Sequence, residues 1–300
     1  MNINIVFFGA SKHVIPLLDV LKENHTLSLI ITTESLPTEP VSTYAKTHTI
    51  PLLTIKQCSN ITIEEIKKTN APIGILAYFG IILPPTVLNL FPKGILNVHP
   101  SLLPLYRGST PVQTAILNGD KTTGVTFIKL DEQTDHGPII SQISEPIHED
   151  DTAETLYQRL FKRGAKILKK DLPPYLEDKV KLKVQDDAKA TFTQDFTRHS
   201  GYFDSNNPPS PQQLDRMIRA YHPWPGSWTR ITTNDERITV NKIIKFLPAS
   251  SHPELLPVDR QGDSGSLKFV LQMEGKKPIS FKDFINGYPQ LAEIIKSIIQ

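Results

Sequence analysis

An amide, an imidazole and a carboxylate stand close together in the middle of the chain, in a pattern that suits acyl transfer. Asn97 and His99 follow the apolar residues 94–96, and Asp135 lies further along the same stretch. In an extended strand, residues two apart face the same side, so the side chains of Asn97 and His99 are predicted to project together. An amide N–H can stabilise an oxyanion, an imidazole can accept a proton near neutral pH, and a carboxylate can orient the imidazole. These groups can carry acyl transfer without a metal ion or a covalent nucleophile.

Each of these residues also has an ordinary structural interpretation. An isolated Asn-x-His pair is most often structural, and Asp135 stands in a segment of Asp, Thr and Gly, where an aspartate commonly caps a turn. Arg107 by itself would be a surface cation. His136, next to Asp135, is a second imidazole that could pair with the carboxylate. The hypothesis of a catalytic site therefore depends on the joint pattern.

The segments that must position these side chains alternate between strands and helices. Apolar runs predict buried strands at residues 3–9, 27–32, 72–78 and 95–98. Helical spacing predicts helices at 14–21 and 152–168, and residues 124–130 and 139–143 resemble the two strands of a hairpin. This alternation predicts an α/β fold with a Rossmann-like, mostly parallel sheet and helices on both faces. Open sheets of this kind bind ligands at the carboxyl ends of their strands.

The character of the chain changes after residue 186, where it becomes polar and rich in Asn and Pro. We therefore predict a catalytic domain at residues 1–188, a linker at 189–205 and a second domain at 206–300. In the second domain a helix is expected at 212–221. The β-like runs that follow cover residues 227–232, 237–246 and 267–273. Short, closely spaced strands predict a small β-barrel.

Composition limits the class of protein. With 300 residues, 39% hydrophobic and 21% charged, the sequence is typical of a globular protein, and a net charge of +2 predicts no strong electrostatic grip on nucleic acid. Cys58 is the single cysteine, so the chain forms neither an intramolecular disulfide nor a cysteine-based zinc site, and we expect no metal. The first residues lack the pattern of a signal peptide, and no apolar stretch approaches the length of a membrane span. We expect a cytoplasmic protein.

The run from Asn97 to Gly108, followed by residues 124–126 and 135–137, resembles the 10-formyltetrahydrofolate-dependent formyltransferase family. The resemblance implies that Asn97, His99 and Asp135 are catalytic and that 10-formyltetrahydrofolate is the formyl donor. The segment matching the family's folate-binding residues is Ser101, Leu102, Leu103 and Pro104. Residues 76–84 are similar to the loop that lines the pteridine pocket, which adds Leu76, Tyr78, Gly80, Ile81 and Leu83.

The C-terminal part of the chain narrows the choice of formyl acceptor. A glycinamide ribonucleotide formyltransferase would end near residue 200, whereas residues 220–228 and 275–284 resemble the post-linker segment and C-terminal end of formyltransferases that act on methionyl-tRNA. This resemblance covers the whole chain. It implies formyl transfer to the α-amine of initiator methionyl-tRNA for translation initiation, with an OB-like C-terminal barrel that binds tRNA. The implied substrate-binding residues are Arg107, Gly108, Lys276 and Lys277, and we expect a monomer.

Two segments depart from the pattern of the enzymes that act on methionyl-tRNA. Those enzymes usually carry a longer insertion rich in Gly and basic residues after the second strand, whereas residues 33–40 here are short and acidic. Their aromatic-containing turn after the first strand is replaced by residues 10–14. The short acidic segment favours a second hypothesis, an amino-sugar nucleotide N-formyltransferase that uses the same donor. A third is a module that binds folate or RNA without turnover, against which the intact set of Asn97, His99 and Asp135 argues.

Overall fold

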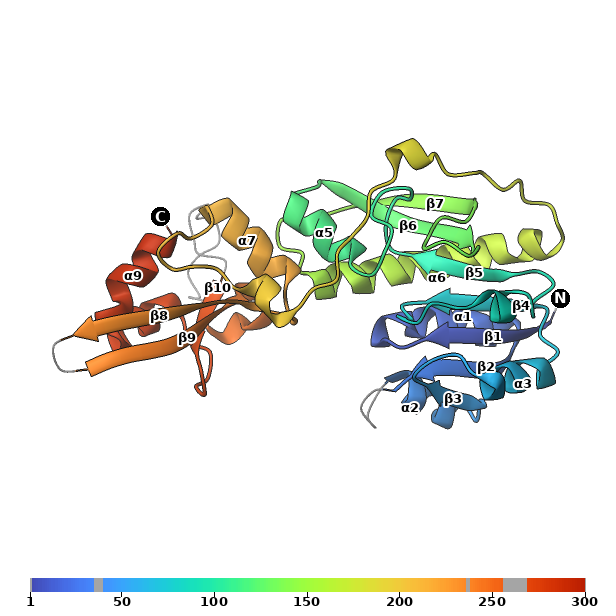
Figure 1. Cartoon of the computed structure of the whole chain (residues 1–300), viewed down its shortest axis with the longest axis horizontal. Helices are drawn as coiled ribbons and strands as arrows, with labels where there is room; N and C mark the ends of the chain where they lie inside the picture. The colour runs from blue at the N-terminus through green and yellow to red at the C-terminus, as the bar shows by residue number, and fades with distance from the viewer. Residues whose placement is uncertain (1, 35–39, 236–237, 256–268, 300) are drawn as a thin grey trace. The chain divides into compact units, whose positions relative to one another are not determined.

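The computed structural model describes residues 2–34, 40–235, 238–255 and 269–299 (Figure 1). Contacts divide the chain into two compact units. The first comprises Met1–Pro111, Thr122–Pro146 and Tyr157–Gln194, and the second comprises Val112–Lys121, Ile147–Leu156 and Asp195–Gln300. The predicted domain limits, with a linker at 189–205, stay a prediction.

The first unit is built on a seven-stranded sheet with the order β3-β2-β1-β4-β5-β6-β7. Its strands are β1 (Asn4–Gly9), β2 (Thr26–Thr33), β3 (Leu52–Ile55), β4 (Ile73–Ala77), β5 (Ile95–His99), β6 (Thr122–Lys129) and β7 (Ile139–Pro146). The pairings among β1 to β5 are parallel, and β6 and β7 add an antiparallel hairpin at one edge. The prediction of a mostly parallel, Rossmann-like sheet is confirmed.

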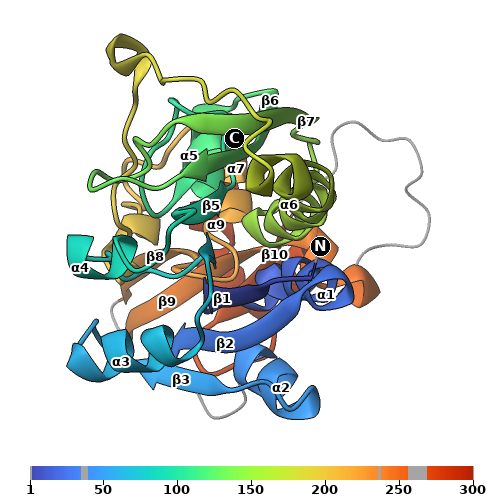
Figure 2. The ribbon, with the colours of Figure 1, turned by 90° about the vertical axis from the view of Figure 1, so that its right-hand side faces the viewer.

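Helices cover both faces of this sheet (Figure 2). Those of the first unit are α1 (Ile15–Asn24), α2 (Pro40–Thr47), α3 (Asn60–Lys68), α4 (Pro85–Leu88) and most of α6 (Ala153–Leu176). Helices α1, α2 and α6 lie on one face, and α3 and α4 lie on the other. The structure extends the helix predicted at 152–168. Helix α6 ends at Leu176 and includes Pro173 and Pro174.

The burial of β1 explains why its sequence is apolar throughout. Ile5, Val6, Phe7 and Phe8 are all fully buried, as expected for a central strand covered on both faces. Val6 and Phe8 belong to one core cluster with residues of α3 and α4. A continuous apolar run therefore marks this strand as internal.

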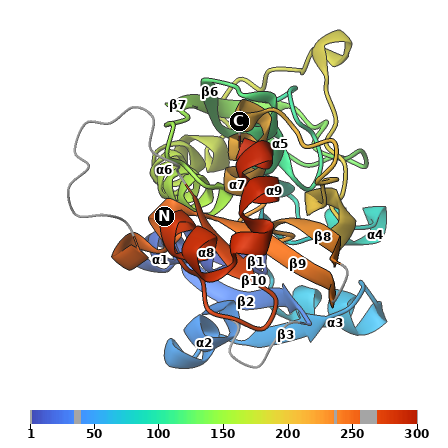
Figure 3. The same cartoon turned by 90° about the vertical axis from the view of Figure 1, so that its left-hand side faces the viewer.

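The second unit contains a three-stranded antiparallel sheet with the order β10-β9-β8 (Figure 3). The strands are β8 (Ser227–Asp235), β9 (Ile238–Pro248) and β10 (Phe269–Met273), and the helices are α5 (Pro111–Asn118), α7 (Pro211–Ala220), α8 (Phe281–Gly287) and α9 (Pro289–Ile299). Side chains from α7, α8 and α9 share one apolar core with the sheet. The small C-terminal β domain is confirmed. Closure into a barrel stays a prediction, because residues 256–268 lie outside the described residues.

Candidate active site

Strand β5 carries two of the predicted catalytic side chains, Asn97 and His99. It pairs with β4 on one side and with β6 on the other, so it lies inside the sheet. All five residues of β5 are buried, and His99 is the last of them. Asn97 is 5% exposed and His99 is 4% exposed. Both polar side chains therefore lie at the carboxyl end of an internal strand, where water has little access.

The carboxylate of Asp135 joins these two side chains. Asn97 Nδ2 donates a hydrogen bond to Asp135 Oδ1 at 3.0 Å, and His99 Nδ1 lies 3.5 Å from Asp135 Oδ2. The backbone N–H of Gly108 donates to the same Oδ2 at 2.8 Å. The side chain of His136 instead contacts Asp131 and Asp187. Of the two imidazoles left open by the sequence, His99 is the one that shares the Asp135 carboxylate with Asn97.

The ring of His99 is held from both sides. Its Nε2 lies 2.9 Å from the carbonyl oxygen of Tyr106. A carbonyl only accepts hydrogen bonds, so Nε2 carries a proton in this arrangement. Its Nδ1 faces the carboxylate of Asp135. Both ring nitrogens of His99 therefore have a partner within the site.

The loops around the site adopt left-handed backbone conformations. The φ angles are 49° for Asp135, 61° for Tyr106 and 115° for Gly108. Aspartate tolerates this region and glycine favours it, but it is uncommon for tyrosine. Such conformations persist only where surrounding contacts hold them, and they concentrate at functional sites.

The predicted folate segment is rigid. Ser101 is fully buried, and its Oγ donates to the carbonyl of Leu105 at 2.6 Å. Leu103 packs in the core, and its backbone N–H donates to Thr126 Oγ1 at 3.1 Å. Pro104, half-buried, follows a cis peptide bond, and Leu102 is half-buried beside β6. The segment leaves the end of β5 in one fixed course.

The second predicted loop leaves the neighbouring strand at the same edge of the sheet. Leu76 of β4 pairs with Asn97 of β5, so the residues that follow Leu76 begin beside the site. Tyr78 is 44% exposed. The space beside Gly80 is open, since no atom lies within 4 Å of the position that a Cβ would take there. The apolar members of the loop behave differently, with Leu83 buried and Ile81 half-buried against the core.

An aromatic cluster lies beside Tyr78. The ring of His13, from the turn after β1, stacks on Tyr157 at a centroid distance of 5.5 Å. Tyr78 meets the edge of Tyr157 at 5.3 Å, and Phe161 completes the group. The turn that departs from the family pattern therefore still supplies an aromatic ring at this edge.

The predicted substrate-binding residues lie in different surroundings. Arg107 is 3% exposed, and its guanidinium contacts Gln185 and Asp187 of the same unit. Lys276 and Lys277 are exposed in the turn after β10, in the second unit. Sequence reasoning missed Gln185, because a lone glutamine in a polar segment carries no periodic or motif signal.

Two further properties concern only the described residues, the grouping of metal-ligating side chains and the length of apolar helices. Within residues 2–34, 40–235, 238–255 and 269–299, no three His, Cys, Asp or Glu side chains gather so as to hold a metal ion. None of the helices described there is both long and apolar enough to cross a membrane.

Comparison with known proteins places the chain in a family. The family profile "Formyl transferase" matches residues 2–172, and "Formyl transferase, C-terminal domain" matches residues 209–289. Methionyl-tRNA formyltransferase from Roseiflexus sp. is 36% identical over 83% of this chain and 78% of its own length. The enzyme of the same name from Halalkalibacterium halodurans is 30% identical over 94% of each chain.

A solved structure shows the same fold. The N-formyltransferase from Helicobacter canadensis, in complex with folinic acid and dTDP-3-aminofucose, superposes with a TM-score of 0.57 at 20% identity. The match covers 82% of this chain and 95% of that one. Both profiles agree with relatives that match 83% and 94% of the chain, so this chain belongs to the formyl transferase family and, within it, to the methionyl-tRNA formyltransferases.

Proposed function

We propose that this protein transfers a formyl group from 10-formyltetrahydrofolate to the α-amine of initiator methionyl-tRNA, for translation initiation. Two observations support the proposal. The relatives that match most of the chain are named methionyl-tRNA formyltransferase. The single structural observation that carries the chemistry is the carboxylate of Asp135, which lies between Asn97 and His99.

Formyl transfer needs an oxyanion donor and a proton acceptor. The neutral amine attacks the formyl carbon, a new C–N bond forms, and the bond from that carbon to N10 of the folate breaks. Asn97 uses one N–H on Asp135, and its amide has a second N–H to donate to the developing oxyanion. The proton released by the amine goes to the pair of His99 and Asp135 and from there to the leaving nitrogen.

The donor is proposed to bind against the two loops that start beside the site. Ser101, Leu102, Leu103 and Pro104 form the segment after β5. Leu76 lies near the end of β4, and Tyr78, Gly80, Ile81 and Leu83 lie in the loop that follows. A flat pteridine ring requires a preformed slot, and the hydrogen bonds that fix Ser101 and Leu103 supply its rigid wall. No metal takes part in this proposal.

The acceptor is proposed to contact both units. Gly108 borders the site through its bond to Asp135, whereas Lys276 and Lys277 offer exposed cations for tRNA phosphates. The domain at residues 206–300 is the proposed tRNA-binding domain. We propose a monomer that works in the cytoplasm, where its acceptor is made.

The second candidate function is amino-sugar nucleotide N-formylation with the same donor. The Helicobacter canadensis enzyme, whose fold this chain shares, was solved with an amino-sugar nucleotide. At 20% identity that likeness concerns the fold alone, and relatives at 30–36% identity carry the other name. The methionyl acceptor is therefore the favoured one.

A competition assay tests the choice. The protein is incubated with 10-formyltetrahydrofolate, charged initiator tRNA and dTDP-3-aminofucose, and both products are quantified. Formylmethionyl-tRNA is the expected product. Formylation of the sugar alone, by folded protein, would overturn the proposal, and a His99→Ala variant serves as the chemical blank.

A further inference from the structure

The segment at residues 183–194, called the strap below, is bound along the loops of the active site. At its start, Lys183 and Ile139 exchange backbone hydrogen bonds of 2.9 and 2.8 Å. Near its end, the Arg107 N–H donates to the Thr191 carbonyl and the Thr193 N–H donates to the Arg107 carbonyl, each at 2.8 Å. The strap is therefore fastened on both sides of the loop that carries Asp135.

Between these two attachments, the side chain of Gln185 spans the loop and the strap. Its Nε2 donates to the backbone carbonyls of Asp135 and Gly137, both at 2.8 Å. Its Oε1 accepts from Arg107 Nε at 3.2 Å and Nη2 at 2.9 Å. A glutamine amide has two donors and two acceptor sites, so all of them are used at a residue that is 7% exposed.

Arg107 fixes Gln185 from the other side. Its Nη2 also donates to Asp187 Oδ1 at 2.7 Å, and its guanidinium lies 5.9 Å from the centre of the Phe192 ring. This ion pair holds the pKa of the Asp187 carboxyl below its usual value. The charge of Arg107 is therefore balanced within the protein, and its planar group orients the amide of Gln185.

We infer that Gln185, held by Arg107, is a positioning residue for formyl transfer, which keeps the carboxylate of Asp135 in register with Asn97 and His99. The inference rests on the proposed function for its reaction. Asp135 has a φ of 49°, and its carboxylate must reach Asn97, His99 and the Gly108 N–H together. Two hydrogen bonds from Gln185 hold this loop, one at the backbone carbonyl of Asp135 and one at that of Gly137.

Removal of the amide frees this loop and leaves polar groups unpaired. Two buried carbonyls lose their donor, and Arg107 loses one of its two acceptor side chains. A displacement of about 1 Å at a catalytic group costs on the order of 10²-fold in rate. Gln185 itself makes no contact with Asn97 or His99 that would let it take part in the chemistry.

Two substitutions separate positioning from packing. Gln185→Ala removes the whole side chain, whereas Gln185→Glu keeps its size and its acceptor for Arg107 but removes the two donors. We expect both variants to lower kcat for formylmethionyl-tRNA formation on the order of 10²-fold, with KM for either substrate little changed.

Arg163→Ala is the matched control for lost stability. Arg163 is one of two arginines on the buried Glu145 of β7. Glu145 pairs with Thr123 of β6, whereas His99 pairs with Thr126, three residues further along β6. Arg163→Ala should lower Tm while leaving kcat unchanged. Wild-type kcat in Gln185→Glu, or an equal loss of kcat in Arg163→Ala at matched Tm, would overturn the inference. If the parent protein forms no formylmethionyl-tRNA, the proposed function fails instead.

Discussion

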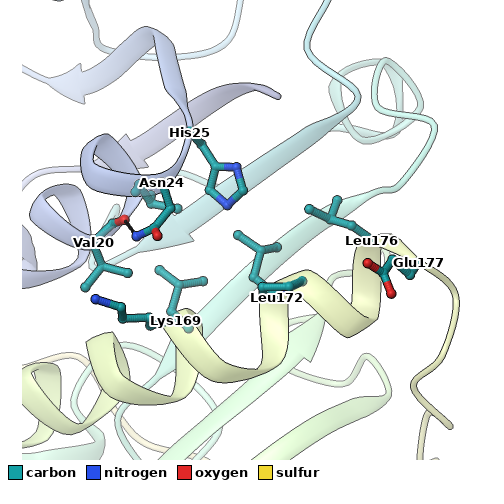
Figure 4. A pocket seen from close by; sticks show the side chains of 10 residues that line it. Val20, Asn24, His25, Lys169, Leu172, Leu176 and Glu177 are labelled. Atoms are coloured by element: carbon teal, nitrogen blue, oxygen red, sulfur yellow. Dashed lines mark hydrogen bonds between the residues drawn. The ribbon is translucent and has the colours of Figure 1, made fainter. Parts of the chain in front are cut away.

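The two ends of the strands in the seven-stranded sheet have different surroundings. The side where the parallel strands end is called the carboxyl edge, and the side where they begin is called the amino edge. At the carboxyl edge, Asp135 accepts hydrogen bonds from Asn97 and from the backbone of Gly108, and its carboxylate lies 3.5 Å from His99 Nδ1. At the amino edge, α1 and the second half of α6 leave a cavity of about 240 Å³ (Figure 4). Its lining is Val20, Leu21, Asn24, His25, Leu168, Lys169, Leu172, Pro173, Leu176 and Glu177.

In this unit the cavity and the cluster of Asn97, His99 and Asp135 lie at opposite ends of the strands. The cavity at the amino edge is lined mainly by leucines and the apolar parts of longer side chains, with charged groups at its rim (Figure 4). The carboxyl edge gathers an amide, an imidazole and a carboxylate. We therefore expect substitutions at the carboxyl edge to change the rate, and those at the amino edge to change stability.

The largest fall in kcat is expected for Asp135→Asn. The substitution keeps the shape but replaces the oxygen that accepts from Gly108 or the one that accepts from Asn97. It also removes the charge that stabilises protonated His99, and proton transfer typically contributes on the order of 10²–10⁴-fold. We expect kcat to fall by about that factor, measured by single-turnover formylation, with Tm reduced only slightly. Full activity of Asp135→Asn would remove the distinction between the two edges.

The second-largest fall in kcat is expected for Asn97→Ala. Loss of a single oxyanion donor costs on the order of 10²–10³-fold in kcat. The KM for the folate donor should stay the same, because the second N–H of Asn97 is used in the transition state rather than in binding. Steady-state kinetics at saturating tRNA would measure the change. A rise in KM at constant kcat would assign Asn97 to substrate binding.

At the amino edge, Leu172→Ala should act on stability alone. Leu172 is 2% exposed and lines the cavity, and removal of a buried leucine side chain costs about 2–5 kcal/mol of unfolding free energy. We expect a lower midpoint in urea and an unchanged kcat under conditions where the protein is folded. A change in kcat at full occupancy of the folded state would show that the two edges are coupled.

The smallest effect is expected for the Tm of His136→Gln, a substitution in the loop that carries Asp135. The hydrogen bond from His136 to Asp131 raises the pKa of this imidazole above its usual value, with a further contribution from Asp187. A raised pKa in the folded state means that the stabilisation is complete below the unfolded pKa of about 6.5 and is lost as pH rises through the folded value. The Tm difference between the parent and His136→Gln should therefore shrink with rising pH. An equal difference at pH 5 and pH 9 would contradict this.

Much of the fold followed from pattern alone. The continuous apolar runs of β1, β4 and β5 identified internal strands, and alternation in β6 identified the antiparallel hairpin. The four-residue strand β3 was missed, because a run of that length carries no clear period. The apolar spacing predicted a helix only as far as residue 168, whereas α6 runs to Leu176 and includes Pro173 and Pro174 in its last turn.

The site was predictable in part, and for a physical reason. Asn97 and His99 were placed together by the two-residue period of a strand, which holds wherever the strand is regular. The contact with Asp135 depends on a loop with a φ of 49°, for which neither period nor composition gives a rule. The roles of Gln185 and Arg107 depend on a strap that returns to this loop from a distant part of the sequence, so only the structure could suggest them.

A double-mutant comparison tests the central claim, that Asp135 makes Asn97 and His99 a single catalytic unit. Single-turnover formylation of charged initiator tRNA is measured for Asn97→Ala, Asp135→Asn and the variant with both changes. If the residues act as one unit, the double variant loses no more activity than the worse of the two single variants. A loss equal to the product of the two single losses would show that the residues act independently, and the account would be wrong.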